Sequence, residues 1–146
     1  MYDVAVIGCG IVGAAAAYEL SRYNCRVLVL EAKNDVANVT TKANSAILHA
    51  GYDPTPGTLM AETNVRGVAL AKELCEKLDV EREEIGSLVL AFGEEDERHL
   101  EKLYQQGLAN GVPGIELLTA DEVHALEPNV SDKVTAALYA PTAAIV

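Results

Sequence analysis

One strand–turn–helix–strand pattern at the start of the chain constrains the fold more than any other feature. An apolar run at 4–7 leads into a turn with glycine at positions 8, 10 and 13, and a helix rich in small residues follows. A second apolar run at 27–30 then ends at Glu31. This order predicts a parallel β–α–β unit, of the kind that a doubly wound sheet repeats several times. It leaves open whether the glycine turn holds a ligand or is only a tight connection.

The spacing of the glycines favours a dinucleotide site. Gly8 permits the tight turn, Gly10 lets the backbone approach a pyrophosphate, and Gly13 lets the helix pack closely on the strand. A helix that begins near Ile11 points its free N–H groups and its positive dipole end at the phosphates. Glu31 then stands where a carboxylate can accept hydrogen bonds from an adenosine ribose.

The carboxylate also selects among nucleotides. Glu31 suits two ribose hydroxyls and repels a 2′-phosphate, so NADP is disfavoured. FAD and NAD both remain compatible with this unit.

Length and charge narrow the class of protein. A chain of 146 residues corresponds to about one domain, but no second β–α–β unit follows Glu31, and the chain ends in an apolar run at 143–146. We therefore expect the leading part of a longer protein. The formal net charge of −11 argues against nucleic-acid partners and against docking on an anionic membrane.

Cysteines and apolar runs bear on the compartment. The three cysteines are odd in number and lack C-x-x-C spacing, which predicts a reducing compartment and no metal site. The first strand begins at Tyr2, which leaves no room for a leader peptide, and no apolar run reaches the roughly 18 residues of a membrane span. The sequence thus predicts a cytoplasmic protein with no transmembrane segment.

Further elements are expected after the opening unit. Residues 32–57 have the composition of a long loop that lines a ligand. Expected after it are helices at 58–78 and 94–110, a short helix that starts from the capping box at 119–122, and strands at 87–92 and 134–140. Gly67 interrupts the first of these helices at a cost of up to about 1 kcal/mol, which suggests close packing against a backbone or a ligand. We expect one domain at 1–85 and the start of an α+β domain at 86–146.

Three histidines are candidates for a chemical role. His49 follows an apolar run in the candidate ligand loop, where it could contact a cofactor; the alternative is a buried histidine bonded to a backbone carbonyl. His99 and His124 lie on expected helices among acidic residues and are interpreted as surface residues. Cys9 stands in the glycine turn as a small residue. No nucleophilic triad is recognisable, so the catalytic residues stay unknown, with His49 as the one candidate near a cofactor.

A family resemblance rests on the loop after Glu31. With the glycine turn, the run Thr41-Lys42-Ala43-Asn44-Ser45-Ala46-Ile47-Leu48-His49-Ala50-Gly51-Tyr52-Asp53 resembles the D-amino-acid oxidase-like FAD-dependent oxidoreductases. With Pro56-Gly57-Thr58-Leu59 and Asn64-Val65-Arg66-Gly67, it is more narrowly similar to bacterial FAD-dependent glycerol-3-phosphate dehydrogenases. L-2-hydroxyglutarate dehydrogenases share the Asn-Ser…His-Ala-Gly loop.

The resemblance implies FAD as cofactor and a Rossmann-like FAD-binding β–α–β unit followed by part of an α+β substrate domain. It places the pyrophosphate at Gly10–Gly13, the adenosine ribose at Glu31, and the isoalloxazine near Ile47 and His49. The remaining implied cofactor contacts are Gly8, Ile11, Val12, Ala32, Lys33, Thr40, Thr41, Asn44 and Ser45.

The implied reaction is hydride transfer from a secondary alcohol to flavin, with glycerol-3-phosphate as first-choice substrate and an unidentified electron acceptor or partner subunit. L-2-hydroxyglutarate or another 2-hydroxy acid is the alternative, and a non-catalytic nucleotide-binding module is a second alternative. Relatives in the family are several hundred residues long, so we expect the 146-residue chain alone to bind FAD weakly and to turn over no substrate.

Overall fold

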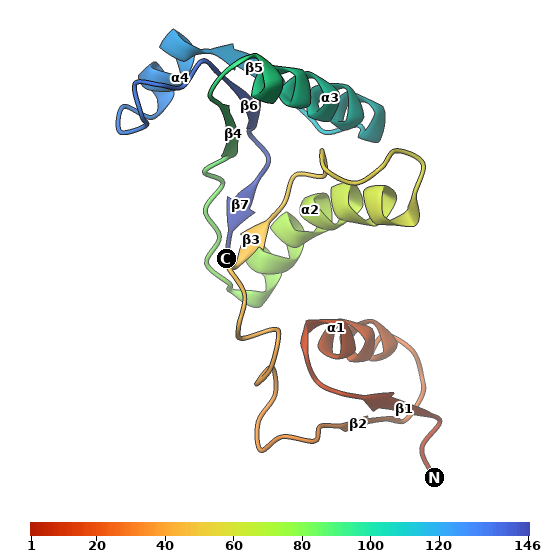
Figure 1. Cartoon of the computed structure of the whole chain (residues 1–146). Coiled ribbons are helices and arrows are strands. Elements are labelled where there is room, and N and C mark those ends of the chain that lie inside the picture. The colour runs from red at the N-terminus through yellow and green to blue at the C-terminus, as the bar shows by residue number, and fades with distance from the viewer. The chain divides into compact units, whose positions relative to one another are not determined.

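A computed structural model describes all residues, 1–146, as two compact units (Figure 1). Unit 1 comprises Met1–Ser45 and unit 2 comprises Ala46–Val146. Unit 1 contains β1 (Val4–Ile7), α1 (Ile11–Leu20) and β2 (Val27–Leu30). Unit 2 contains β3 (Ile47–Leu48), α2 (Leu59–Leu78), β4 (Ser87–Ala91), α3 (Glu94–Asn110), β5 (Glu116–Thr119), α4 (Ala120–Leu126), β6 (Ala136–Ala140) and β7 (Ala144–Ile145). None of these helices combines the length and the apolar character that a membrane-spanning helix requires.

Unit 1 is the β–α–β unit that the opening pattern predicts. Strands β1 and β2 pair in parallel from Val4 opposite Val27 to Ile7 opposite Leu30. Helix α1 connects the strands and packs against both. None of its residues is buried, although its sequence is apolar on all sides. A helix of this composition is normally covered all round, so α1 has more apolar surface than unit 1 conceals.

Unit 2 is built on an antiparallel sheet in the order β4-β6-β5. Because alternate residues of a strand point to opposite faces, β6 contributes to two cores. Leu138 packs with Leu100 and Leu103 of α3, while Ala137 packs with Val123 of α4. The two helices therefore cover opposite faces of the sheet, and Figure 1 shows them on separate sides of β6.

Local sequence signals set the helix ends. Thr58 caps α2 by accepting a hydrogen bond from the Ala61 amide. Helix α3 ends at Gly111 in the left-handed conformation, as its Asn-Gly stop predicts. Thr119 and Glu122 form both bonds of a capping box at the start of α4. The predicted helices at 58–78 and 94–110 and the predicted short helix are thus confirmed.

Three expectations need correction or stay open. Strand β5 and the two-residue strands β3 and β7, which pair antiparallel, were not expected from the sequence. The close packing of Gly67 against another backbone is not found within this chain, because a Cβ there would meet nothing within 4 Å; packing against a ligand stays a prediction. The predicted division near residue 85 concerns domains of a longer protein and stays a prediction; within this chain the compact units divide after Ser45.

Candidate cofactor-binding site

The glycine turn after β1 has the geometry that its sequence spacing requires. Gly8 has a φ of 91°, in the left-handed region that glycine adopts without strain. A Cβ on Gly13 would lie 2.0 Å from the carbonyl oxygen of Gly8, so α1 can approach the turn only because position 13 lacks a side chain. A Cβ on Gly10 would meet the Thr41 hydroxyl at 3.0 Å. Gly8 therefore supplies the left-handed turn, whereas Gly13 removes a clash with the turn backbone and Gly10 a tight contact with Thr41.

The N-terminus of α1 offers backbone donors. Gly10 is the N-cap and has no side chain that could accept from the helix. The Ile11 amide donates to Thr41 Oγ1 at 3.0 Å, and the Ala14 amide donates to the Gly10 carbonyl at 2.9 Å. The amides of Val12 and Gly13 have no partner within the protein. Unpaired N–H groups at the positive end of a helix form an anion-binding position.

Glu31 is held against the same turn. One carboxylate oxygen, Oε2, accepts from the Cys9 amide at 2.8 Å, and Oε1 accepts from the Lys33 amide at 2.9 Å. These bonds, that of Cys9 first, hold the pKa of Glu31 below its usual value, so the side chain is anionic at neutral pH. A carboxylate has about four acceptor positions, and the backbone amides leave at least one of them for the hydroxyls of a ribose.

The segment after Glu31 folds back onto the glycine turn. The Ala37 amide donates to the Cys9 carbonyl at 2.9 Å, which adds a second tether beside the Thr41 contact. Asn44 Nδ2 donates to the carbonyls of Thr40 and Thr41, at 3.2 and 2.7 Å, and so fixes the backbone around the Thr41 hydroxyl. The predicted site residues of unit 1 thus gather at the turn or are tied to it. Ala32 is exposed but its backbone amide bonds to the Glu31 carboxylate, whereas Ser45 is exposed without such a bond.

Ile47 and His49 belong to unit 2. Ile47 lies in β3 and is exposed, and His49 follows this strand. His49 is itself exposed, so the alternative of a buried histidine is not what the structure shows. Its carbonyl accepts a hydrogen bond from Asn64 Nδ2. A cavity of about 190 Å³ lies here, and its lining includes His49, Tyr52, Asp53 and Asn64.

Helix α3 fixes the loop after His49 in a way that the sequence reasoning missed. Gln106 Nε2 donates to the carbonyls of Tyr52 and Asp53, at 3.4 and 3.1 Å. Asn110 Nδ2 donates to the carbonyls of Gly51 and Pro54, at 2.9 and 2.8 Å. The only sequence signal was that two amide side chains stand four residues apart on one helix face. These two side chains hold the His-Ala-Gly loop in place, although the loop itself has no regular secondary structure.

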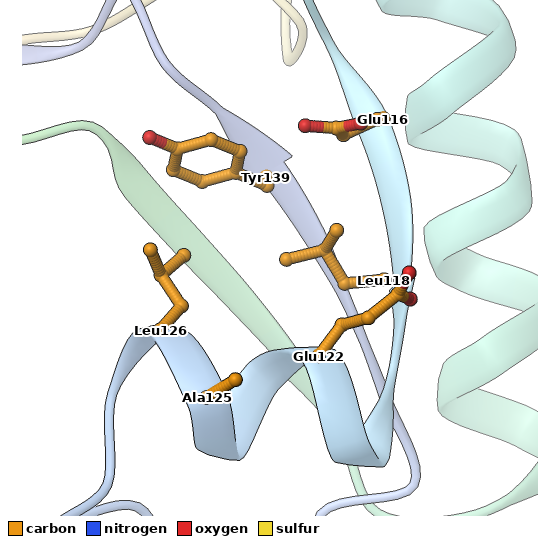
Figure 2. A pocket seen from close by; sticks show the side chains of 6 residues that line it. All are labelled: Glu116, Leu118, Glu122, Ala125, Leu126 and Tyr139. Carbon is orange, nitrogen blue, oxygen red and sulfur yellow. The ribbon is translucent and has the colours of Figure 1, made fainter.

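A second hollow lies between α4 and the sheet, with a volume of about 330 Å³ (Figure 2). Figure 2 shows Leu118, Leu126 and Tyr139 around it, with the carboxylates of Glu116 and Glu122 at its margin. Glu122 Oε2 accepts from the Thr119 amide, which holds the pKa of Glu122 below its usual value. Two carboxylates disfavour an anionic ligand, so we assign no substrate to this hollow.

The remaining histidines and the cysteines form no recognisable site. No group of three or more His, Cys, Asp or Glu side chains is arranged to hold a metal ion. His99 is exposed and His124 is half-buried. The three cysteines are free thiols.

Comparison with known proteins places the chain in a family. A family model described as FAD dependent oxidoreductase matches residues 3–146. The chain is 51% identical over 146 residues to a glycerol 3-phosphate dehydrogenase of Caloramator mitchellensis, covering 100% of this chain and 30% of that protein. It is 34% identical over 149 residues to the mitochondrial L-2-hydroxyglutarate dehydrogenase of Dictyostelium discoideum, covering 100% of this chain and 33% of that protein.

A solved structure agrees. The dithionite-reduced L-alpha-glycerophosphate oxidase of Mycoplasma pneumoniae, described with FAD bound, matches with a TM-score of 0.90 at 34% identity over 99% of this chain and 38% of that one.

The chain belongs to the FAD-dependent oxidoreductase family of the D-amino-acid oxidase type. It is an α/β chain that corresponds to the FAD-binding N-terminal region of these flavoproteins. It spans about a third of the length of the relatives that it matches. FAD is the cofactor of this family, so the nucleotide that the glycine turn left open between FAD and NAD is FAD.

Proposed function

We propose that this chain is the leading part of a FAD-dependent dehydrogenase that oxidises glycerol-3-phosphate. The observation that carries the proposal is the 51% identity, over the whole chain, to a protein named glycerol 3-phosphate dehydrogenase. The structural neighbour named as a glycerophosphate oxidase supports the same substrate class.

The residues of unit 1 fit the adenosine half of FAD. The unpaired amides of Val12 and Gly13 would bind the pyrophosphate, and Gly10 leaves the approach free of a side chain. The fixed, anionic carboxylate of Glu31 would accept hydrogen bonds from the ribose hydroxyls. Thr41 Oγ1 already lies at the Ile11 amide, so its hydroxyl would contact the phosphates or give way to them.

The remaining contacts follow from the loop. Lys33 lies beside Glu31 and would balance the negative charge of that carboxylate near the adenosine. Asn44 keeps Thr40 and Thr41 in place for the pyrophosphate and ribityl chain. His49, held through its carbonyl by Asn64, would contribute the imidazole nearest to the flavin ring. When FAD is bound, its flavin ring supplies the hydride-accepting chemistry, and the protein supplies orientation and charge.

The test is anaerobic reduction of the flavin in the protein that contains this chain. Bleaching of the flavin absorbance by glycerol-3-phosphate, and not by L-2-hydroxyglutarate, is the expected result. A protein that binds ADP but carries no flavin would instead be a non-catalytic nucleotide-binding module, and the proposal would fail.

The second candidate substrate is L-2-hydroxyglutarate, favoured by the 34% identity to a dehydrogenase of that name. The same anaerobic experiment separates the two, because only one alcohol would bleach the flavin. For the 146-residue chain alone we expect no bleaching and weak FAD binding, since it covers 30% of the glycerol 3-phosphate dehydrogenase.

A further inference from the structure

A small cavity in unit 2 lies beside α2 and is distinct from the cavity that His49 lines. Its volume is about 140 Å³. Val65, Val68 and Ala69 of α2 supply apolar walls. Its polar lining groups are Lys72, Arg82, Glu84 and Thr142.

Arg82 is the group that makes this cavity unusual. Its side chain is 10% exposed, and its terminal Nη2 lies 3.0 Å from Glu84 Oε1. Its Nε is buried and has no hydrogen-bond partner within the protein. The hydroxyl oxygen of Thr142, on the same cavity, is also buried and unpartnered. Buried polar groups are nearly always paired, so two unpaired ones on one small cavity point to a shared ligand.

Charge and size define the class of that ligand. Lys72 and Arg82 carry two positive charges and Glu84 carries one negative charge, which leaves the lining one positive charge in excess. Pockets for drug-sized ligands measure about 300–1,000 Å³, so a cavity of about 140 Å³ suits a small ion rather than a nucleotide. Guanidinium groups favour the oxygens of phosphates and carboxylates.

We propose that this cavity binds one small oxyanion. The anion accepts hydrogen bonds from Arg82 Nε and the Thr142 hydroxyl and pairs with the Lys72 ammonium at the exposed edge. The bond from Arg82 to Glu84 holds the guanidinium in place and leaves its Nε free for the ligand. This inference does not rest on the proposed function, because the cavity lies wholly in unit 2 and uses none of the cofactor residues.

The shared chemistry could come from a free ion, from the end of a phosphate ester, or from a carboxylate. The experiment therefore titrates inorganic phosphate, glycerol-3-phosphate and acetate separately into the ¹⁵N-labelled 146-residue chain in a phosphate-free buffer. The readout is the chemical shift of the Arg82 Nε–H group, which gives a Kd for each probe. We expect a saturable shift with at least one probe, and the tightest of the three identifies the source.

Two variants test the lining. Lys72→Gln removes a charge from an exposed side chain, and Thr142→Val removes only the hydroxyl. Each is expected to weaken binding by about threefold to tenfold. Lys102→Gln, an exposed charge change on α3, is the matched control and is expected to leave the Kd unchanged. Circular dichroism verifies that each variant is folded. If Thr142→Val does not fold, Lys72→Gln alone tests the proposal.

The proposal is overturned if no probe shifts the Arg82 resonance at concentrations up to the millimolar range. It is equally overturned if the shift is the same in Lys72→Gln as in Lys102→Gln. In either case Arg82 is a structural partner of Glu84 only.

Discussion

All of the buried hydrophobic residues belong to unit 2, whereas every residue of unit 1 is at least partly exposed. Unit 1 leaves large apolar side chains in the open, with Ile7 78% and Val12 81% exposed. Its long-range order comes instead from polar tethers at the turn, such as those of Glu31 and Thr41. Segments of this size bury too little surface to be stable alone, so unit 1 depends on a ligand or on further chain to a degree that unit 2 does not.

The two units also carry two kinds of site. In unit 1 the glycine turn presents backbone donors and a fixed carboxylate, so the site is preorganised although its surroundings are not buried. In unit 2 a packed core supports amide side chains that hold the His-Ala-Gly loop. We infer that cofactor binding would stabilise unit 1 far more than unit 2. A ligand that binds only the folded form of a unit stabilises that folded form, and most of the expected cofactor contacts lie in unit 1.

The largest expected effect comes from the core of unit 2. Leu138→Ala removes a side chain that is 0% exposed and contacts α3, and it should cost about 3 kcal/mol of stability. The matched change in unit 1 is Leu30→Ala, at a side chain 48% exposed, which should cost about 1 kcal/mol or less. Chemical unfolding monitored by amide hydrogen exchange measures both. Equal costs would show that unit 1 has a core comparable with that of unit 2.

The next effect distinguishes two glycines. Gly13→Ala places a Cβ 2.0 Å from the Gly8 carbonyl and should weaken ADP binding roughly tenfold or more, because the turn must shift. Gly67→Ala, in the middle of α2, meets nothing within 4 Å and should stabilise that helix by up to about 1 kcal/mol. Isothermal titration with ADP and thermal unfolding give the two values. Unchanged ADP affinity in Gly13→Ala would contradict a nucleotide site at this turn.

The third effect compares two helix caps. Thr41→Val removes the acceptor of the Ile11 amide and should destabilise α1 by about 1 kcal/mol. Thr58→Val removes the N-cap of α2 and should cost a similar amount in unit 2. Hydrogen exchange resolves where the loss falls. ADP should restore protection in Thr41→Val but not in Thr58→Val, and equal rescue of both would show that the units do not respond separately.

Features set by local chemistry could be predicted from the sequence. The capping box at Thr119 and the stop at Gly111 each depend on residues within a few positions of one another. The β–α–β unit follows from the order of consecutive apolar and small-residue runs, although its paired strands are 23 residues apart. The glycine turn and Glu31 could be predicted because the motif spacing itself encodes their proximity.

Contacts between distant residues could not be predicted in this way. The bond from Ile11 to Thr41 and the bonds from Asn110 to the His-Ala-Gly loop join residues 30 or more positions apart. Threonine and asparagine are common in loops and at helix ends, so composition gave no partner for them. The expected backbone contact at Gly67 is absent for a related reason, because the conformational cost of a helical glycine does not identify the residues that pack against it.

The smallest expected effect is the pH dependence of stability that one glutamate contributes in each unit. Glu31 and Glu122 each have a pKa below the ordinary value of 4.5 because backbone amides bond to their charged forms. The stabilisation from each is therefore complete above about pH 5 and is lost as pH falls through the lowered pKa of the folded state. The amide shifts of Cys9 and Thr119 should report both titrations, with midpoints below 4.5.

Bound ADP should change the titration of Glu31 but not that of Glu122. Ribose hydroxyls that donate to Glu31 favour its charged form, so ADP should lower the Cys9 midpoint further and leave the Thr119 midpoint where it was. Glu31→Gln should abolish the Cys9 titration, and Glu122→Gln should abolish only that of Thr119. A Cys9 midpoint that does not move with saturating ADP would mean that the carboxylate, although fixed beside the turn, does not hold the ribose.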